Sequence, residues 1–317
     1  MRIRYGYSIT ELLIAMLLGL LLLAIALTAF SSLSRSAKQA QQLAELQQTG
    51  QFMLSLMQNE LQNIGFWGGK ANVILAAETT KPDAPSPDCA NDALDSGSFP
   101  SAELPFVTLY AKLVSSGGQL NCISSALKDS ELLQVKRLIG QVQSLDMLKA
   151  NRFYLETNWQ HSRFISAASD GLQSAMDYYP YQHLVFYVQN QWREIEFVPV
   201  LMRKRLIRNA SGHASMATDS IIDGVERLHF EFGIDTDADG SLDYQQATAH
   251  MTANQWQQHS SRIVSIKFYI LLRALTQDKH YINNNIYKMG SHQFNANGDH
   301  YRRLLISSTV FFHNTQL

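Results

Sequence analysis

The chain has 317 residues, in which 26 Lys and Arg nearly balance 27 Asp and Glu. Its length suits one large domain or two ordinary ones, and its 46% hydrophobic and 17% charged residues exclude a largely disordered protein. Because no excess of positive charge is present, nucleic acid is not predicted as the main ligand.

The N-terminal part contains an apolar segment long enough to cross a membrane. In residues 12–30 only Thr28 is polar. At ~1.5 Å per helical residue, this segment nearly spans a hydrocarbon layer of ~30 Å. Arg2 and Arg4 precede it, so the positive-inside rule predicts a cytoplasmic N-terminus and an exoplasmic chain after Ser31.

Two other interpretations of this segment remain open. A cleaved secretory signal also begins with arginines and an apolar run, and Ala24-Ile25-Ala26 offers a cleavage site. The length of the run and its continuation into a second helical pattern argue against a signal. A plain membrane anchor is the other alternative, but Glu11 at the entering end of the run argues against it, since a carboxylate in lipid needs a partner.

The residues before the apolar segment carry a processing pattern. Residues 4–12 read RYGYSITEL, which resembles a prepilin processing site with a basic leader, a glycine, an aromatic residue and a glutamate. The resemblance implies that a prepilin peptidase cleaves between Gly6 and Tyr7 and methylates the new amine of Tyr7, although the family usually has phenylalanine there. It also implies that Glu11 pairs with the amine of a neighbouring subunit. Ser8-x-x-Glu11 fits a helix capping box as well, and both can hold together.

A second helical pattern follows the apolar segment. After Arg35 the chain is rich in glutamine, and apolar residues recur at helical spacings, which predicts a continuous helix from Tyr7 to Ile64 with one apolar stripe. Glycines at 65, 68 and 69 end the pattern, and Gly50 indicates a bend or a close contact. A coiled-coil stalk is the alternative. The stripe comprises Leu43, Leu46, Met53, Leu54, Met57, Leu61 and Ile64.

Two cysteines follow a proline-rich loop at residues 81–89. Cys89 and Cys122 lack the spacing of a metal site, so zinc is not indicated. In an exoplasmic body, an even pair favours a disulfide that closes a loop of about thirty residues and contributes roughly 3 to 4 kcal/mol. Two unrelated buried thiols remain the alternative. The resemblance does not decide the pairing, since family members often carry a cysteine where this chain has Gly69.

The rest of the chain contains several strand patterns, and residues 72–127 match nothing specific. The patterns are rich in Val, Ile, Phe and Tyr, and some alternate with period two. A helix followed by strands predicts an α+β fold. The predicted strands are residues 131–138, 184–189, 192–201, 224–233, 263–272 and 303–312.

Residues 219–235 extend the resemblance, because DSIIDGVERLHFEFGID is similar to a block of PilW-type minor pilins. Weaker echoes are residues 64–68, 271–273 and 302–303. The resemblance implies a type IV pilin-like fold, in which a long N-terminal helix packs on an antiparallel β-sheet. The implied parts are a leader (1–6), a transmembrane half-helix (7–30), an amphipathic half-helix (31–64) and a periplasmic globular domain (65–317).

One motif in the body suggests an ion. Residues 235–243 fit the first nine positions of a D-x-D-x-D-G calcium loop, with Gly240 at the sharp turn. Gln246 stands where an EF-hand has a bidentate glutamate, so a full EF-hand is not predicted. A solvated acidic hairpin is the alternative. The predicted calcium ligands are Asp235, Asp237, Asp239, Ser241 and Asp243.

No enzyme motif is present, the ten histidines are scattered singly, and no cofactor is required beyond a structural calcium ion. The resemblance implies a minor pilin of a Gram-negative inner membrane that is incorporated into the pilus. Its partners would be other minor pilins, the major pilin, the prepilin peptidase and a pilus-tip adhesin, in a tip complex that supports adhesion, twitching motility or DNA uptake. The alternatives are a J-type pseudopilin of type II secretion and an anchored periplasmic hydrolase or calcium-binding module.

Overall fold

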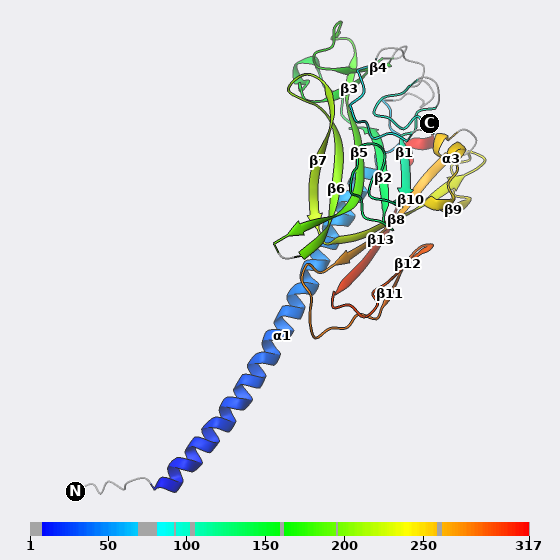
Figure 1. Ribbon diagram of the computed structural model, residues 1–317. Coiled ribbons are helices and arrows are strands. Elements are labelled where there is room, and N and C mark those ends of the chain that lie inside the picture. Colours follow the sequence, from blue (N-terminus) through cyan, green and yellow to red (C-terminus); the bar gives the residue numbers. More distant parts are fainter. Residues whose placement is uncertain are drawn as a thin grey trace. The chain divides into compact units, whose positions relative to one another are not determined.

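The computed structural model describes residues 8–68, 81–91, 93–101, 105–158, 162–194, 196–258 and 262–316. It divides into two units, residues 1–48 and 49–317, and each is described by itself (Figure 1). Gly6 and Tyr7, where cleavage is predicted, lie outside the described residues, as does Gly69.

The described chain begins with a long helix and continues mainly as strands. The helices are α1 (Ile9–Leu61), η1 (Leu145–Met147), η2 (Thr248–His250), α3 (Ala253–Gln257) and η3 (His313–Gln316). The strands are β1 (Leu109–Leu113), β2 (Glu131–Leu138), β3 (Phe153–Thr157), β4 (Ser162–Ser166), β5 (Asp177–Arg193), β6 (Glu196–Arg208), β7 (Ala214–Asp223), β8 (Val225–Asp235), β9 (Tyr244–Ala247), β10 (Arg262–Arg273), β11 (Ile286–Met289), β12 (His292–Asn295) and β13 (Arg303–Phe311). The α+β prediction is confirmed.

The first unit contains the apolar part of α1. Its large apolar side chains from Leu12 to Phe30 are 55–71% exposed, and the helix is long and apolar enough to cross a membrane. At its start, the Ser8 amide donates a hydrogen bond to the Glu11 carboxylate (2.8 Å), and the Thr10 amide donates to the Ser8 hydroxyl (3.2 Å). The carboxylate half of the predicted capping box is therefore present.

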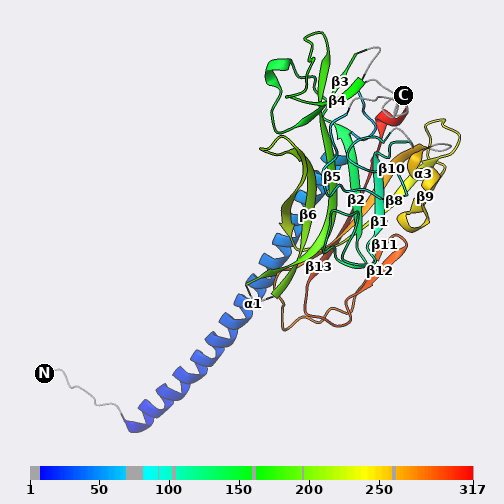
Figure 2. The same cartoon turned by 45° about the horizontal axis from the view of Figure 1, so that its top comes forward.

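The second unit contains two larger sheets and a hairpin, all antiparallel (Figure 2). The first sheet has the order β1-β2-β5-β3-β4, and β6 joins it to β7. The second has the order β13-β10-β8-β9, and β11 pairs with β12 as a separate hairpin. Every strand pairing within the described body is thus of the kind that the resemblance implies.

The first sheet branches at β5, because two different strands pair with the same edge of β5. Tyr181 pairs with Leu138 of β2 and with Phe153 of β3, so β2 and β3 lie on opposite edges of β5. Further along, Leu184 pairs with β2 and with Arg205 of β6. Strands β3 and β6 therefore occupy the same edge of β5, one after the other.

The end of α1 supplies apolar side chains to the core of the second unit. Met53, Met57 and Leu61 are fully buried, and Ile64 is 3% exposed, which confirms this part of the predicted stripe. Full burial of such a side chain contributes roughly 1.5 to 3 kcal/mol. The helix ends at Leu61, three residues before the predicted Ile64, and a turn with Gly65 at φ 85° follows.

Gly50 allows α1 to approach the second sheet closely. A Cβ atom at this position would lie 3.4–3.5 Å from side chains of Leu272, Leu304 and Ile306. Two turns later, Gln58 Nε2 donates to Ser308 Oγ at 3.3 Å. The close contact predicted for Gly50 is confirmed, and a coiled-coil stalk is wrong for residues 49–61.

Most of the predicted strands are confirmed, with one error. Strands β2, β8, β10 and β13 match predictions within two residues, and residues 184–189 lie inside β5. The strand predicted at 192–201 is confirmed from Glu196 on, inside β6, but it is wrong as one continuous strand. The chain reverses between β5 and β6: Arg193 pairs with Glu196, and Glu194 has a φ of 47°. This turn contains neither glycine nor proline, so the sequence does not indicate where β5 ends and β6 begins. The apolar residues of the two strands therefore resemble those of one strand.

Candidate functional sites

Glu11 lies in the first turn of α1, at the start of the apolar run. Its side chain is exposed and accepts a hydrogen bond from the Ser8 amide, and it forms no ion pair among the described residues. A single amide leaves acceptor capacity on a carboxylate. The first unit thus presents an acidic group that a cation outside this chain can reach.

In the second unit, three separate sequence blocks meet at one place, which we call the signature corner: Gly224, Glu226, Arg273 and Arg303. The strand register pairs Arg273 of β10 with Arg303 of β13. The Arg273 amide donates to the Gly224 carbonyl at 2.8 Å, and the Gly224 amide donates to the Pro199 carbonyl at 2.7 Å. The blocks that resemble PilW are therefore neighbours in space.

Gly224 is the residue that makes the turn from β7 to β8 possible. Its φ is 91°, and a Cβ atom there would lie 2.9 Å from the Arg273 carbonyl oxygen. Only glycine tolerates both the left-handed backbone and this close approach. Steric constraints therefore explain why glycine occupies this position of the sequence block.

Arg303 holds the signature corner together through buried charges. Its side chain is 2% exposed, and it donates to Glu226 (2.6 and 3.1 Å) and to Asp299 (2.6 and 2.8 Å). Burial lowers the pKa of Arg303, but the hydrogen bonds to Asp299 and Glu226 outweigh it and raise this pKa overall. Burial likewise raises the pKa of Asp299, yet Arg303 brings it below the usual value. Arg303 and Asp299 therefore stay charged at neutral pH.

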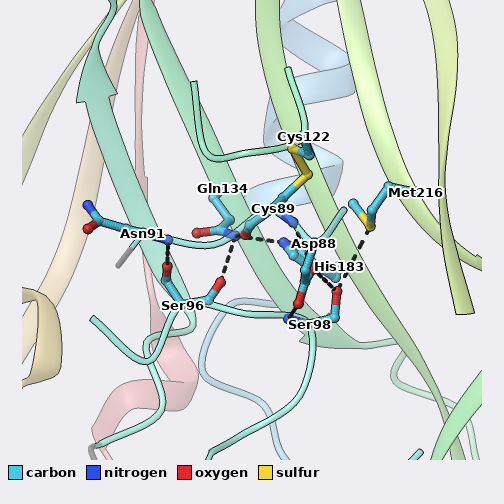
Figure 3. Close-up of a disulfide and its surroundings, with 9 residues drawn as sticks. All are labelled: Asp88, Cys89, Asn91, Ser96, Ser98, Cys122, Gln134, His183 and Met216. Atoms are coloured by element: carbon cyan, nitrogen blue, oxygen red, sulfur yellow. Dashed lines mark hydrogen bonds between the residues drawn. A yellow bond between two sulfur atoms is a disulfide. The ribbon is translucent and has the colours of Figure 1, made fainter. Parts of the chain in front are cut away.

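The structure joins Cys89 and Cys122 in a disulfide, beside a buried polar network (Figure 3). The Asp88 carboxylate accepts hydrogen bonds from the amide of Cys89 (2.7 Å) and from the amide and hydroxyl of Ser98 (both 2.6 Å). The Ser98 oxygen also lies 2.9 Å from His183 Nδ1. These bonds fix the loop that carries the disulfide against β5.

Asp88, Ser98 and His183 have the residue types of a hydrolase triad but not its arrangement. The Ser98 hydroxyl donates to Asp88, so Nδ1 of His183 is left to donate to the serine oxygen and cannot take its proton. Ser98 and His183 are also fully buried. Burial, followed by the charge of Lys136, lowers the pKa of His183 well below its usual value. The network is structural and lends no support to the hydrolase alternative.

Lys136 is a buried cation near this network. It is fully buried, its Nζ donates to the Val107 carbonyl at 2.5 Å, and it lies 4.5 Å from the centre of the Phe106 ring. Burial lowers the pKa of Lys136 to about 7, against the opposing effect of Asp88 and Asp95. The folded protein therefore holds this lysine close to its titration point at neutral pH.

The predicted calcium loop joins β8 to β9, and its first three acidic residues converge. The carboxylates of Asp235, Asp237 and Asp239 offer oxygen atoms within 4.8 Å of one another. Asp235 is fully buried and accepts hydrogen bonds from the amides of residues 238 (2.7 Å) and 240 (2.9 Å). Asp243, by contrast, accepts hydrogen bonds from the Thr236 amide (2.7 Å) and hydroxyl, and Ser241 donates its amide to Asp239 (2.6 Å). The structure brings together three of the five predicted ligands.

The sequence prediction missed a cluster of Glu131, His229 and His292. The two histidines are scattered in the sequence, but their rings stack at a centroid distance of 4.1 Å beside Glu131. Strand alternation places His229 on the face of β8 that also carries Arg227 and Glu231, where a histidine is ordinary. No local pattern therefore pointed to the cluster.

The comparisons with known proteins concern mainly the second half of the chain. Residues 185–314 match the family model described as type IV pilus-assembly protein W, PilW. This range contains the signature corner and the predicted calcium loop, and the match supports a PilW-type family assignment. The match supports involvement in type IV pilus assembly. No curated protein and no solved structure matched the chain.

Proposed function

We propose that this PilW-type chain is a minor pilin, a membrane-anchored subunit that enters the type IV pilus with other minor pilins and the major pilin. In this proposal it belongs to a complex at the pilus tip that primes polymerisation and contacts a tip adhesin. The pilus would then support adhesion, twitching motility or DNA uptake. The family match over residues 185–314 supports a role in pilus assembly.

The proposal rests mainly on the exposed apolar surface and the acidic residue of the first unit. Apolar side chains cover α1 from Leu12 to Phe30 and are exposed. They suit lipid before assembly and neighbouring apolar helices after it. Glu11 is the acidic group at the start of this surface. A carboxylate costs roughly 2.5 to 3.5 kcal/mol near the bilayer centre and less near the interface, so a cationic partner for Glu11 would stabilise the assembled state.

The partner that we propose for Glu11 is the N-terminal amine of a neighbouring subunit. The prepilin peptidase would create this amine by cutting between Gly6 and Tyr7. The pairing fixes the axial position of one subunit against the next, because only one offset brings the two charges together. Glu11 is thus a registration residue in the filament.

The same proposal assigns the body to the periplasm and the helix to the inner membrane. The disulfide between Cys89 and Cys122 fits this assignment, since disulfides persist in the oxidising periplasm. It also includes a structural calcium ion at Asp235, Asp237 and Asp239, whose converging carboxylates repel one another unless a cation intervenes.

Mass spectrometry of the N-terminus tests the proposal. Protein isolated from its own cells should begin at Tyr7 and carry one methyl group. A Gly6→Val variant should accumulate as uncut precursor, whereas Gly19→Ala, in the open middle of α1, should be processed normally. A native protein that retains Met1, or that starts near Leu27, would contradict the proposal.

A J-type pseudopilin would have the same leader, so the phenotype of a gene deletion distinguishes this alternative from the minor pilin. Deletion of the gene should reduce surface pili and leave type II secretion intact. Loss of secreted enzymes with normal pili would favour the pseudopilin instead. The anchored hydrolase or calcium module predicts no methylated Tyr7, so the same mass measurement excludes or supports it.

A further inference from the structure

A cluster of three side chains joins all three sheets of the second unit. Glu131 is the first residue of β2 in the first sheet, His229 belongs to β8 in the second, and His292 begins β12 in the hairpin. Glu131 is fully buried, and the side chains of His229 and His292 are 3% and 25% exposed. The cluster is thus closed toward the core and open on the side of His292.

The spacing within the cluster suits a shared metal ion. Glu131 Oε1 lies 3.5 Å from His229 Nδ1 and 3.3 Å from His292 Nε2, and the three atoms lie within 4.8 Å of one another. Zinc binds nitrogen and oxygen at ~2.0–2.1 Å, so two of its ligand atoms in a tetrahedron lie roughly 3.3–3.4 Å apart. A closure of the cluster, together with rotation of one imidazole out of its stacked orientation (interplanar angle 22°), would direct all three atoms at one ion.

The same three atoms lack hydrogen-bond partners within the described part of the chain: Glu131 Oε1, His229 Nδ1 and His292 Nε2. Buried polar atoms are normally satisfied, and an unsatisfied one costs roughly 1 to 3 kcal/mol. Three such atoms that face one another indicate a common ligand.

The other oxygen of Glu131 shows how the carboxylate is oriented. Oε2 accepts hydrogen bonds from the Phe230 amide (2.7 Å) and the Thr248 hydroxyl (2.8 Å). These two bonds leave Oε1 directed at the histidines. Such outer contacts are typical of metal-binding carboxylates.

A simple ion pair explains the cluster less well. One oxygen, Glu131 Oε1, faces both imidazoles at 3.3–3.5 Å, which is longer than a good charge-assisted hydrogen bond of ~2.7–2.9 Å. Protonation of both stacked rings would also place two like charges at a centroid distance of 4.1 Å. A cation between the three atoms satisfies all of them at once.

We propose that Glu131, His229 and His292 bind one divalent transition-metal ion of the zinc class. Two imidazole nitrogens and one carboxylate oxygen form a donor set that zinc prefers, whereas calcium requires many oxygens. Water occupies the fourth position on the exposed side of His292. The ion fastens the β11–β12 hairpin to both sheets, so its role is structural.

The test uses the full-length chain in detergent, without a polyhistidine tag, after chelator treatment and dialysis. Calorimetric titration with ZnCl₂ should show one saturable site per chain, and CaCl₂ should not compete for it. His292→Ala and Glu131→Gln should each weaken zinc binding by about 100-fold or more, since loss of an outer-shell partner alone costs about 10- to 100-fold. His280→Ala, which removes an exposed histidine outside the cluster, should bind as the parent does.

Two further measurements separate a lost site from a lost fold. Saturating zinc should raise the Tm of the parent by about 5 °C and leave the Tm of both cluster variants unchanged. Cobalt should give the visible absorption of a tetrahedral nitrogen and oxygen site in the parent alone. Absence of saturable zinc binding, or equal binding by parent, His292→Ala and Glu131→Gln, would overturn the assignment.

Discussion

The two units of the protein differ in whether certain acidic side chains have a cationic partner within the described chain. In the second unit, two largely buried carboxylates have arginine partners within the chain, in the pairs Glu226–Arg303 and Glu156–Arg163. In the first unit, Glu11 forms no ion pair among the described residues. Glu226 and Glu156 thus have their counter-charges inside the body, whereas no counter-charge for Glu11 lies among the described residues.

Apolar side chains show the same contrast. The body encloses an aromatic cluster whose rings pack mostly edge to face, and its main members are Trp67, Phe99, Phe106, Phe153, Phe164 and Tyr181. The large apolar side chains from Leu12 to Phe30 remain exposed. One unit is stabilised by its own interior and the other by its surroundings, so mutations in the two units should have different readouts.

The largest effect should come from Glu11→Gln. This change removes the negative charge at the start of the apolar run and keeps the shape of the side chain, so assembly into pili should fall about 10-fold or more, since each 1.4 kcal/mol of lost pairing is a factor of ten. The Tm of the detergent-solubilised protein should not change. Glu45→Gln, at an exposed glutamate of the same helix, is the matched control and should assemble normally. Normal amounts of pili in the Glu11→Gln variant would show that assembly does not need the charge of Glu11, and the proposed difference between the units would be wrong.

In the body, Arg303→Met should cause the largest loss of stability. It leaves Glu226 and Asp299 without their buried partner, and such a loss costs roughly 3 to 5 kcal/mol, or about 10 °C in Tm. Arg193→Met breaks the exposed pair with Asp223 and should cost less than about 1 kcal/mol. Thermal unfolding of the two variants compares them, and equal losses would show that the burial of the Arg303 pair does not matter.

Lys136 should give the stability of the body a pH dependence. Its pKa is about 7 in the folded protein, against 10.5 for an ordinary exposed lysine, so between these limits the unfolded chain binds more protons. The free energy of unfolding should therefore rise with pH, by about 2 kcal/mol from pH 7 to pH 9, and be flat below pH 7 as far as this group is concerned. Lys136→Met should abolish this rise in denaturant titrations. A parent that shows no rise would contradict the burial of the charge.

The smallest expected effect is that of calcium on the acidic loop. Millimolar calcium should stabilise the parent by about 1 kcal/mol, or about 3 °C in Tm, as expected for a weak extracellular site. Asp239→Asn should lose this shift because it removes one of the three converging carboxylates. Asp170→Asn, at an exposed aspartate outside the loop, is the control. A calcium shift that persists in Asp239→Asn would place the ion elsewhere.

The elements that could be predicted from the sequence are those with a long local pattern. The periodicity of α1 located its buried stripe at Met53, Met57 and Leu61. Segments rich in Val, Ile, Phe and Tyr, some of them alternating with period two, located β2, β8, β10 and β13. Short strands such as β11 and β12 were missed because four residues carry too little pattern. The error at residues 192–201 arose because an apolar pattern does not reveal a chain reversal that lacks glycine or proline.

The same distinction applies to the sites. Asp235, Asp237 and Asp239 were predicted together because they are close in the sequence. The pair Glu226–Arg303 and the cluster of Glu131 with His292 join residues from different strands, and only the strand register brings them together. Their spacing in the sequence carries no signal, which is why the histidines were interpreted as single residues.

The contact of α1 with the last strand imposes an order on biogenesis. Gly50 and Gln58 lie against β13, and the hydrogen bond from Gln58 reaches a residue 250 positions further along the chain. The helix leaves the ribosome first, yet its binding surface on the body is complete only after residues 303–311 have been synthesised. Contacts of such long range form slowly, and an incomplete chain exposes apolar surface and unpaired strand edges. Truncation near the C-terminus should therefore destabilise the whole body. A membrane tether would limit encounters between chains whose bodies are still incomplete.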